Sequence, residues 1–195
     1  DYSALLASQN AQDFRVNALV CAPRGELLVG TSAGVYSLMP ADSGYTITTL
    51  FQGQQVRALM LASDGSIWVG LHEAGLIHID SARTLQTAVV LSKESSVSVL
   101  SIFEDRERRI WAGTLNGVYL KLPAQTHWQR FAASAAPQSL PGNLVRNFLQ
   151  TRDGRIWIGT HSGLARVDSV QIDGDQPNIL FSRFTLRDGL PNPTV

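Results

Sequence analysis

The 195-residue sequence has one cysteine, few charged residues and no long apolar run. Cys21 alone can form neither an intrachain disulfide nor a cysteine-based zinc site. Charged residues make up 16% of the chain, and the sixteen basic side chains balance the sixteen acidic ones. This balance gives no electrostatic reason to expect nucleic acid or a membrane surface as a partner.

Membrane-spanning and targeting segments are also missing from the sequence. No apolar run approaches the ~18 residues of a membrane span, and the first residues lack a signal-peptide pattern. What the chain does have is 44% hydrophobic residues. That content, at this length, suits a soluble globular domain with a sizeable core.

One stretch of sequence recurs four times along the chain. Its copies begin at Val16, Val56, Val99 and Val145, at intervals of 40, 43 and 46 residues. Periods of this length are typical of β-propeller blades. In each copy an apolar residue stands 12 positions after the first Val, and a glycine stands two positions after that apolar residue. These repeat positions are Leu28, Trp68, Trp111 and Trp157, and Gly30, Gly70, Gly113 and Gly159.

Each copy predicts four short strands. In the second copy, residues 56–61 are apolar except for Arg57, as in an innermost strand packed on both faces. The turn Asp64-Gly65 leads into the alternating residues 66–70, and residues 75–80 make a third strand. No amphipathic helical pattern is present. The sequence therefore predicts an all-β protein of four four-stranded antiparallel sheets, with the Trp positions buried between neighbouring sheets.

The repeats also predict how the chain is divided. We expect blades at residues 16–55, 56–98, 99–144 and 145–194, with residues 1–15 as the outer strand of a preceding blade. The stretch that precedes the fourth copy recurs at the carboxyl terminus, so that Val195 stands where a fifth copy would begin. This favours an arc of a larger propeller over a closed four-bladed ring. Cys21, on the first innermost strand, is expected to be buried.

The repeat resembles that of a known family. Residues 153–168, DGRIWIGTHSGLARVD, are similar almost throughout to the two-component regulator propeller repeat, whose pattern is Asp-Gly, Ile-Trp, a small apolar residue, Gly-Thr and then Gly-Leu or Gly-Val. Two positions depart from that pattern, since Leu28 replaces the Trp and Glu107-Arg108 replaces Asp-Gly.

The resemblance has functional implications. In that family such repeats form large propellers in the extracytoplasmic sensor regions of membrane-bound histidine kinases and diguanylate cyclases. It implies a ligand-sensing or signal-transmitting module in the periplasmic part of an inner-membrane protein. Catalysis by a kinase or cyclase domain would then occur outside this segment, and no cofactor is expected within it.

The triplet Thr160-His161-Ser162 suggests a nucleophilic site at first sight. Adjacent residues on a tight loop point in different directions, however, and the corresponding loops of the other copies carry unrelated residues. A nucleophile needs its base within hydrogen-bond reach and a third group to orient that base. We therefore expect a polar hairpin loop, with ligand contact as the alternative.

A candidate ligand site follows from the second position of each copy. This position holds Asn17, Arg57, Leu100 and Arg146, whereas the first position is always Val. Buried guanidinium groups need partners, so Arg57 and Arg146 should reach solvent, a carboxylate or a ligand anion. They could instead clamp backbone carbonyls.

In the functional interpretation, the two arginines border one polar mouth together with loop residues of the same face. The ligand class would be an oligosaccharide or a sugar acid. The side chains that could bind a metal ion come from loops of non-adjacent blades, so we expect no metal site. The proposed mouth residues are Arg57, Arg146, His72, Glu73, Asn116 and His161.

Two other functions remain open from the sequence. A propeller can serve as a protein-interaction scaffold, which would show a flat rim instead of a polar concave pocket. It can also be an enzyme of the streptogramin-lyase kind, which would show a His and a Glu converging within one mouth.

Overall fold

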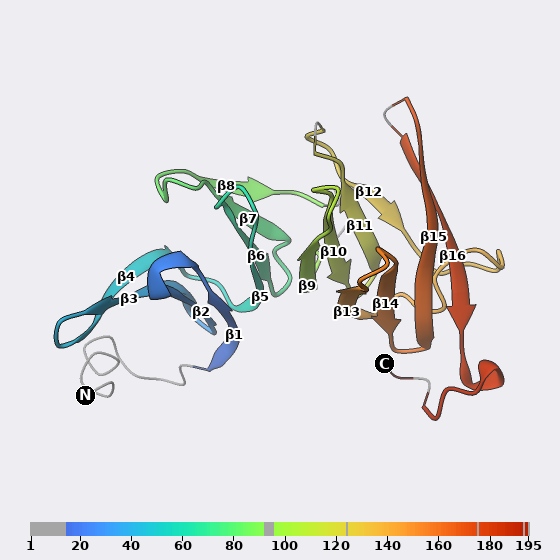
Figure 1. The fold of residues 1–195 in the computed structure, drawn as a ribbon, viewed down its shortest axis with the longest axis horizontal. Helices are drawn as coiled ribbons and strands as arrows, with labels where there is room; N and C mark the ends of the chain where they lie inside the picture. The colour runs from blue at the N-terminus through green and yellow to red at the C-terminus, as the bar shows by residue number, and fades with distance from the viewer. Residues whose placement is uncertain (1–14, 92–95, 124, 175, 193, 195) are drawn as a thin grey trace.

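The computed structural model describes residues 15–91, 96–123, 125–174, 176–192 and 194. Its strands form four four-stranded antiparallel sheets, each following the order of the chain (Figure 1). Two three-residue 3₁₀ helices, η1 (Pro23–Gly25) and η2 (Leu186–Asp188), complete the described elements. The sheets comprise β1 (Val16–Cys21), β2 (Leu27–Thr31), β3 (Gly34–Ala41) and β4 (Gly44–Gln52); β5 (Val56–Leu61), β6 (Ile67–Leu71), β7 (Leu76–Ile79) and β8 (Gln86–Val89); β9 (Val99–Glu104), β10 (Ile110–Thr114), β11 (Gly117–Lys121) and β12 (Gln129–Phe131); and β13 (Val145–Gln150), β14 (Ile156–Thr160), β15 (Gly163–Asp173) and β16 (Gln176–Phe184).

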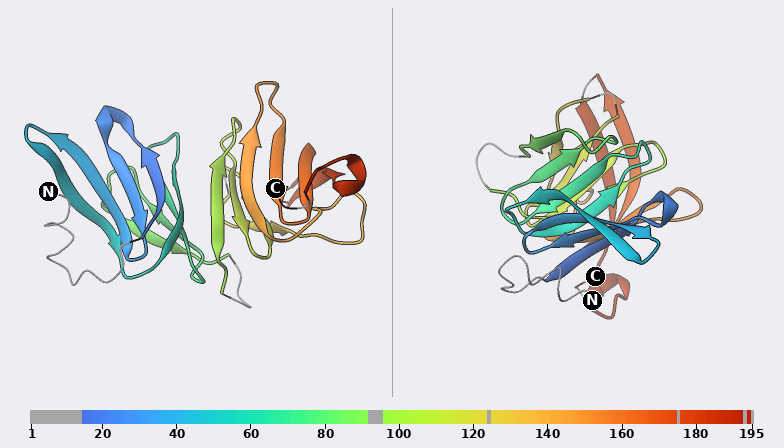
Figure 2. Two further views of the ribbon diagram at one scale, coloured as in Figure 1. Left: turned by 90° about the horizontal axis from the view of Figure 1, so that it is seen from below. Right: turned by 90° about the vertical axis from the view of Figure 1, so that its left-hand side faces the viewer.

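The four sheets stand side by side in an arc, as Figures 1 and 2 show. Their first strands are innermost and contact one another in chain order, β1 with β5, β5 with β9 and β9 with β13. In both figures the first and fourth sheets lie at opposite ends of an open arc. The predicted all-β propeller architecture is confirmed. The strand expected within residues 1–15 falls, apart from Arg15, outside the described residues.

The hydrophobic core consists of three layers, each between two neighbouring sheets. The repeated apolar position is second in the second strand of every sheet, and in the first three sheets its side chain belongs to the core layer shared with the following sheet. Leu28, Trp68 and Trp111 are buried there. Trp157 is only half-buried, because no sheet follows the fourth among the described residues. Burial of this side chain therefore depends on the neighbouring blade.

A valine-to-glycine contact joins consecutive sheets and explains why these two residues recur together. A Cβ added to Gly30 would lie 2.7 Å from Cγ1 of Val56, at the start of the next innermost strand. The same construction places a Cβ on Gly113 2.7 Å from Cγ1 of Val145. Only glycine leaves room for the valine of the following sheet to approach this closely.

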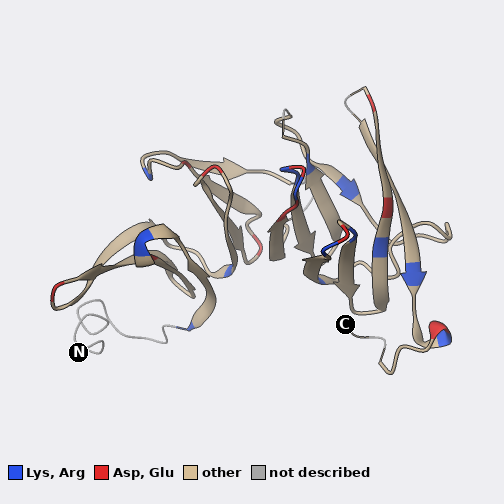
Figure 3. Cartoon of the chain, viewed as in Figure 1, with Lys and Arg blue, Asp and Glu red and all other residues tan. Residues whose placement is uncertain are grey.

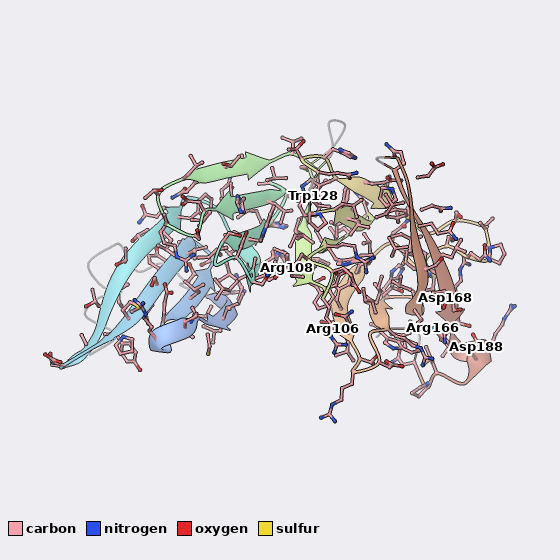
Figure 4. The ribbon with its side chains drawn as sticks, turned by 45° about the horizontal axis from the view of Figure 1, so that its top comes forward. Arg106, Arg108, Trp128, Arg166, Asp168 and Asp188 are labelled. Atoms are coloured by element: carbon pink, nitrogen blue, oxygen red, sulfur yellow. The ribbon has the colours of Figure 1, made fainter. Side chains whose placement is uncertain are left out.

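The burial of two side chains, Cys21 and Trp128, differs from what the sequence predicts. Cys21 is exposed, not buried, because β1 belongs to the end sheet and no described sheet covers the face on which the thiol lies. Trp128 lies off the repeat position, where the sequence favours an exposed side chain. The ring of Trp128, which Figure 4 labels, is instead partly buried. It packs edge-on against Trp68, with the centroids 5.5 Å apart.

Candidate ligand-binding mouth

The second residue of each innermost strand lies in a β-bulge. In the first sheet Val16 pairs with Thr31 and Ala18 with Gly30, so Asn17 has no partner opposite it. The same shift leaves Arg57, Leu100 and Arg146 without an opposite residue. A bulge re-aims the side chain of the extra residue. This is why the second position differs in environment from the valine before it, and why both arginines are exposed.

Arg57 contacts the loop between β6 and β7. Its Nη2 lies 3.2 Å from Nδ1 of His72, and the hydroxyl of Ser98 lies 3.2 Å from the same nitrogen. Because a guanidinium can only donate, Nδ1 of His72 accepts, and the ring proton is assigned to Nε2. The buried Ser98 hydroxyl also accepts a hydrogen bond of 2.9 Å from the backbone N–H of Glu73. Ser98 thus fixes the loop from the neighbouring blade.

The loop that carries His72 and Glu73 differs from its counterparts. In the first, third and fourth sheets a buried threonine ends the second strand, and its hydroxyl donates to the carbonyl of the glycine three residues later. The second sheet has Leu71 at that place, one more residue in the loop, and a left-handed conformation at Glu73 (φ 56°). Without the threonine to close it, this loop displays two titratable side chains.

Thr160 explains the triplet in the fourth sheet. Its buried hydroxyl donates to the carbonyl of Gly163 at 2.8 Å and accepts from the N–H of Ser162 at 3.2 Å. The backbone N–H of His161 donates to the carbonyl of Leu144. Thr160 therefore closes the hairpin loop, and its hydroxyl is already engaged on both sides.

The other proposed residues are not joined to the Arg57 cluster. Asn17, at the bulge of the first sheet, donates a hydrogen bond of 2.9 Å from Nδ2 to the carbonyl of Val56, so it has a structural role. The carbonyl of Asn116 accepts a hydrogen bond of 2.7 Å from Nε of Arg130. Within the described residues, the side chain of Arg146 makes no hydrogen bond or ion pair. The structure thus brings together Arg57, His72 and Glu73, and leaves Asn116 on the third blade and Arg146 and His161 on the fourth.

Ser98 is the member of this cluster that the sequence does not predict. It immediately precedes Val99, at a position that Arg15, Gln55 and Leu144 occupy in the other copies. No common residue type marks the position, and only the packing of the third blade against the second reveals its contact with His72.

Nothing at this mouth resembles an acid–base pair drawn from different blades. Nε2 of His72 and Oε1 of Glu73 lie 3.9 Å apart, but the residues are adjacent, and their side chains are 37% and 69% exposed. In the part of the chain that the structure describes, no group of three or more His, Cys, Asp or Glu residues could hold a metal ion. Acidic and basic residues are interspersed along the arc (Figure 3).

A cavity of about 210 Å³ lies on the outer side of the same loop. Its walls are mainly apolar and come from Ala74 and Gly75, from the end of β8 and from the segment that enters β9. The cavity does not contain Arg57 or His72. The polar cluster and the apolar hollow are therefore separate features on two sides of one loop.

Comparison with known proteins identifies the repeat. Residues 93–116 and 139–162 match the family described as two component regulator propeller. These segments contain the start of the third and fourth copies, including Trp111 and Trp157. The comparison thus identifies this repeat in two segments of the chain. No curated protein sequence matches the chain.

Several solved structures share the fold. The extracellular domain of a putative hybrid two component system from B. thetaiotaomicron has a TM-score of 0.72 and 22% identity, over 94% of this chain and 24% of that one. The virginiamycin B lyase from Staphylococcus aureus has a TM-score of 0.67 and 15% identity, over 94% of this chain and 58% of that one. PorZ, a bacterial surface component of the type-IX secretion system of Porphyromonas gingivalis, has a TM-score of 0.60 and 15% identity, over 94% and 36%.

These identities show a common fold and no more. The chain spans about a quarter of the length of the two-component extracellular domain and a little over half of the lyase. Among the described residues no helix is long and apolar enough to cross a membrane.

Proposed function

We propose that the chain is a ligand-binding propeller segment in the extracytoplasmic sensor region of a membrane-bound signalling receptor. The family repeats support the class of protein, and one structural neighbour is itself an extracellular domain of a hybrid two-component system. Anchoring in the inner membrane, periplasmic location and a kinase or cyclase output are parts of the same proposal.

The observation that carries the ligand-binding proposal is the exposure and bonding of the Arg57 guanidinium group. The bulge directs its guanidinium to an exposed position, and its hydrogen-bond partner there is Nδ1 of His72. No carboxylate among the described residues forms an ion pair with it. A guanidinium group held in this way can bind a carboxylate by donating two parallel hydrogen bonds to it. With His72, Glu73 and the nearby loops, this favours a sugar acid or an acidic oligosaccharide as the ligand.

Calorimetric titration with a panel of neutral and acidic sugars tests this proposal. Replacing Arg57 by alanine should weaken binding of an acidic ligand at least tenfold, since a charge-assisted hydrogen bond contributes about 1.5–3 kcal/mol. Arg24→Ala is the matched control, because Arg24 is also exposed but lies in the turn before β2. If the Arg57→Ala protein binds an acidic ligand as tightly as the wild type, the site is not at this mouth.

We also propose that further blades of the same polypeptide flank the arc. Support comes from the apolar side chains at both ends. Val16 and Leu19 in β1 are 57% and 60% exposed, and Leu149 in β13 is 62% exposed. The valines equivalent to Val16 in the other three sheets are buried by their neighbours. The exposed faces of the end sheets therefore match surfaces that are internal elsewhere in the arc.

A further inference from the structure

The turn between the first two strands of a blade can be tied to the blade that follows. Ser63, in the turn of the second blade, donates from its N–H and its hydroxyl to the carboxylate of Glu104 at 2.7 and 2.6 Å. Glu104 ends the innermost strand of the third blade. Counted from the first valine of each blade, Glu104 stands at the sixth position, with Cys21, Leu61 and Gln150, and Ser63 stands at the eighth, with Pro23, Arg106 and Arg152.

The third and fourth blades are joined through the same two positions. The N–H of Arg106 donates to Oε1 of Gln150 at 3.1 Å. Nε2 of Gln150 donates to the carbonyl of Gly154 at 3.0 Å, which leaves the carboxamide oxygen to accept from Arg106. The guanidinium of Arg106 also reaches the fourth blade, where Nη1 donates to the carbonyl of Arg152 at 3.0 Å. In both interfaces a side-chain oxygen at the sixth position therefore accepts the N–H of the preceding turn.

The interface between the first and second blades lacks both members of this pair. Pro23 holds the eighth position of the first blade, and proline has no N–H to donate. Leu61 holds the sixth position of the second blade, and its apolar side chain packs against the core layer between the first two sheets. An acceptor is thus present where the turn has an N–H and absent where it has none. The two positions match each other across all three interfaces.

The fourth blade presents a turn that has no match. Its eighth residue is Arg152, which has the residue type of Arg106 and is likewise exposed. In the part of the chain that the structure describes, Arg152 takes part in one hydrogen bond, which its carbonyl accepts from Arg106. The N–H and the guanidinium of Arg152 are therefore left to interact with whatever covers the open face of the fourth sheet.

We propose that this open face binds a blade with a carboxylate or carboxamide side chain at its sixth position. The inference rests on the proposed function, in which further blades flank the arc. The side-chain oxygen accepts the N–H of Arg152, as Gln150 accepts that of Arg106, and the guanidinium of Arg152 reaches a carbonyl of the neighbouring turn. The first blade of a second molecule does not meet this requirement, because its sixth residue is Cys21 and a thiol is a weak acceptor.

Amide hydrogen exchange of Arg106 tests the matching within the 195-residue chain. In Gln150→Leu the acceptor is lost, and the N–H of Arg106 should exchange about tenfold faster or more, whereas that of Ser63 should not change. Leucine suits this place, since Leu61 holds it in the second blade. The control Gln150→Glu keeps an acceptor of the kind that Glu104 provides, so the rate should stay within about threefold of the wild type. Unchanged exchange of Arg106 in Gln150→Leu would overturn the matching.

The N–H of Arg152 tests the partner itself. It should exchange fast in the 195-residue chain, and about tenfold more slowly or more in a longer piece of the protein that includes the proposed following blade. Replacing the sixth residue of that blade by leucine should restore fast exchange. The half-buried Trp157 reports independently on whether the face is covered, because any blade that packs there should bury its indole.

The two readouts separate failure of this inference from failure of the proposed function. If Trp157 becomes buried in the longer piece while the N–H of Arg152 still exchanges fast, a blade follows without the acceptor, and the inference is wrong. If neither changes, no blade covers the face, and the proposal of flanking blades fails with it. Slow exchange of Arg152 that appears in the 195-residue chain as its concentration rises would show that a second molecule covers the face, and would also overturn the inference.

Discussion

At the scale of single residues, Arg108 occupies a backbone conformation that glycine normally holds. Its φ is 61°, in the left-handed region, and the equivalent turn positions of the second and fourth copies are Gly65 (φ 85°) and Gly154 (φ 88°). The departure from Asp-Gly in the third repeat therefore changes the residue but not the turn. A side chain in this region costs roughly 1–2 kcal/mol.

Replacing Arg108 by glycine should stabilise the protein. Relief of the backbone strain outweighs the larger entropy of glycine in the unfolded chain, and a net gain of about 0.5–1 kcal/mol is expected in urea unfolding. The reverse exchange, Gly154→Ala, should lose a similar amount, because a Cβ there meets nothing within 4 Å and only the backbone is strained. An Arg108→Gly protein less stable than the wild type would show that the arginine side chain has a stabilising contact.

His78 links stability to pH. Burial against Trp68, with ring centroids 4.4 Å apart, lowers its pKa below the ordinary 6.5, although Asp64 and Asp80 oppose the shift and Lys121 adds to it. A lowered pKa means that the unfolded chain binds the proton more readily than the folded one. The contribution of His78 is therefore present above pH 6.5 and is lost as the pH falls through the lowered pKa.

The expected result is a loss of unfolding free energy between about pH 7 and 5 that is smaller in a His78→Gln variant. Urea unfolding across this range measures the difference, and the remaining three histidines give the same background in both proteins. Identical pH dependence of the two proteins would mean that His78 is not protonated differently on folding.

At the scale of elements, the contact between a glycine and the valine of the next sheet sets the spacing of the blades. In Gly113→Ala the new methyl group would overlap Val145, Ser101 and Phe148. Overpacking of this kind costs about 1–3 kcal/mol. The double variant Gly113→Ala, Val145→Ala should lose less than the sum of the two single losses, because the smaller residue at 145 makes room for the methyl. Additive losses in thermal or urea unfolding would contradict a direct contact.

At the scale of the whole molecule, Cys21 can test whether a further blade covers the open face of the first sheet. In the 195-residue chain the thiol is exposed, so a bulky thiol reagent should label it in native buffer nearly as fast as in urea. If a blade precedes the arc as proposed, a longer piece of the protein that includes it should slow this labelling strongly. Fast labelling in both would argue against a blade on that side, and slow labelling in the shorter chain would contradict the exposed position.

Much of the architecture was predictable from the sequence because the repeat is periodic. The four sheets, their order and the inter-sheet position of Trp68 and Trp111 follow from a Val, an apolar residue and a glycine at fixed spacing. The candidate site was less accessible. Adjacency in sequence relates His72 to Glu73, but the contact of His72 with Arg57 depends on a bulge, and that with Ser98 depends on the neighbouring blade.

The sequence by itself determined the fold and the repeat class, since local strand patterns and a fixed glycine position are properties of each copy alone. The tertiary structure decided which side chains are covered, because each copy hides its apolar face only against the next one. Cys21 and Trp157 have the right residue types for an interior, yet they are exposed and half-buried where the arc ends. Arg57 has the residue type of a clamp, yet it lies at a bulge and its side chain is exposed.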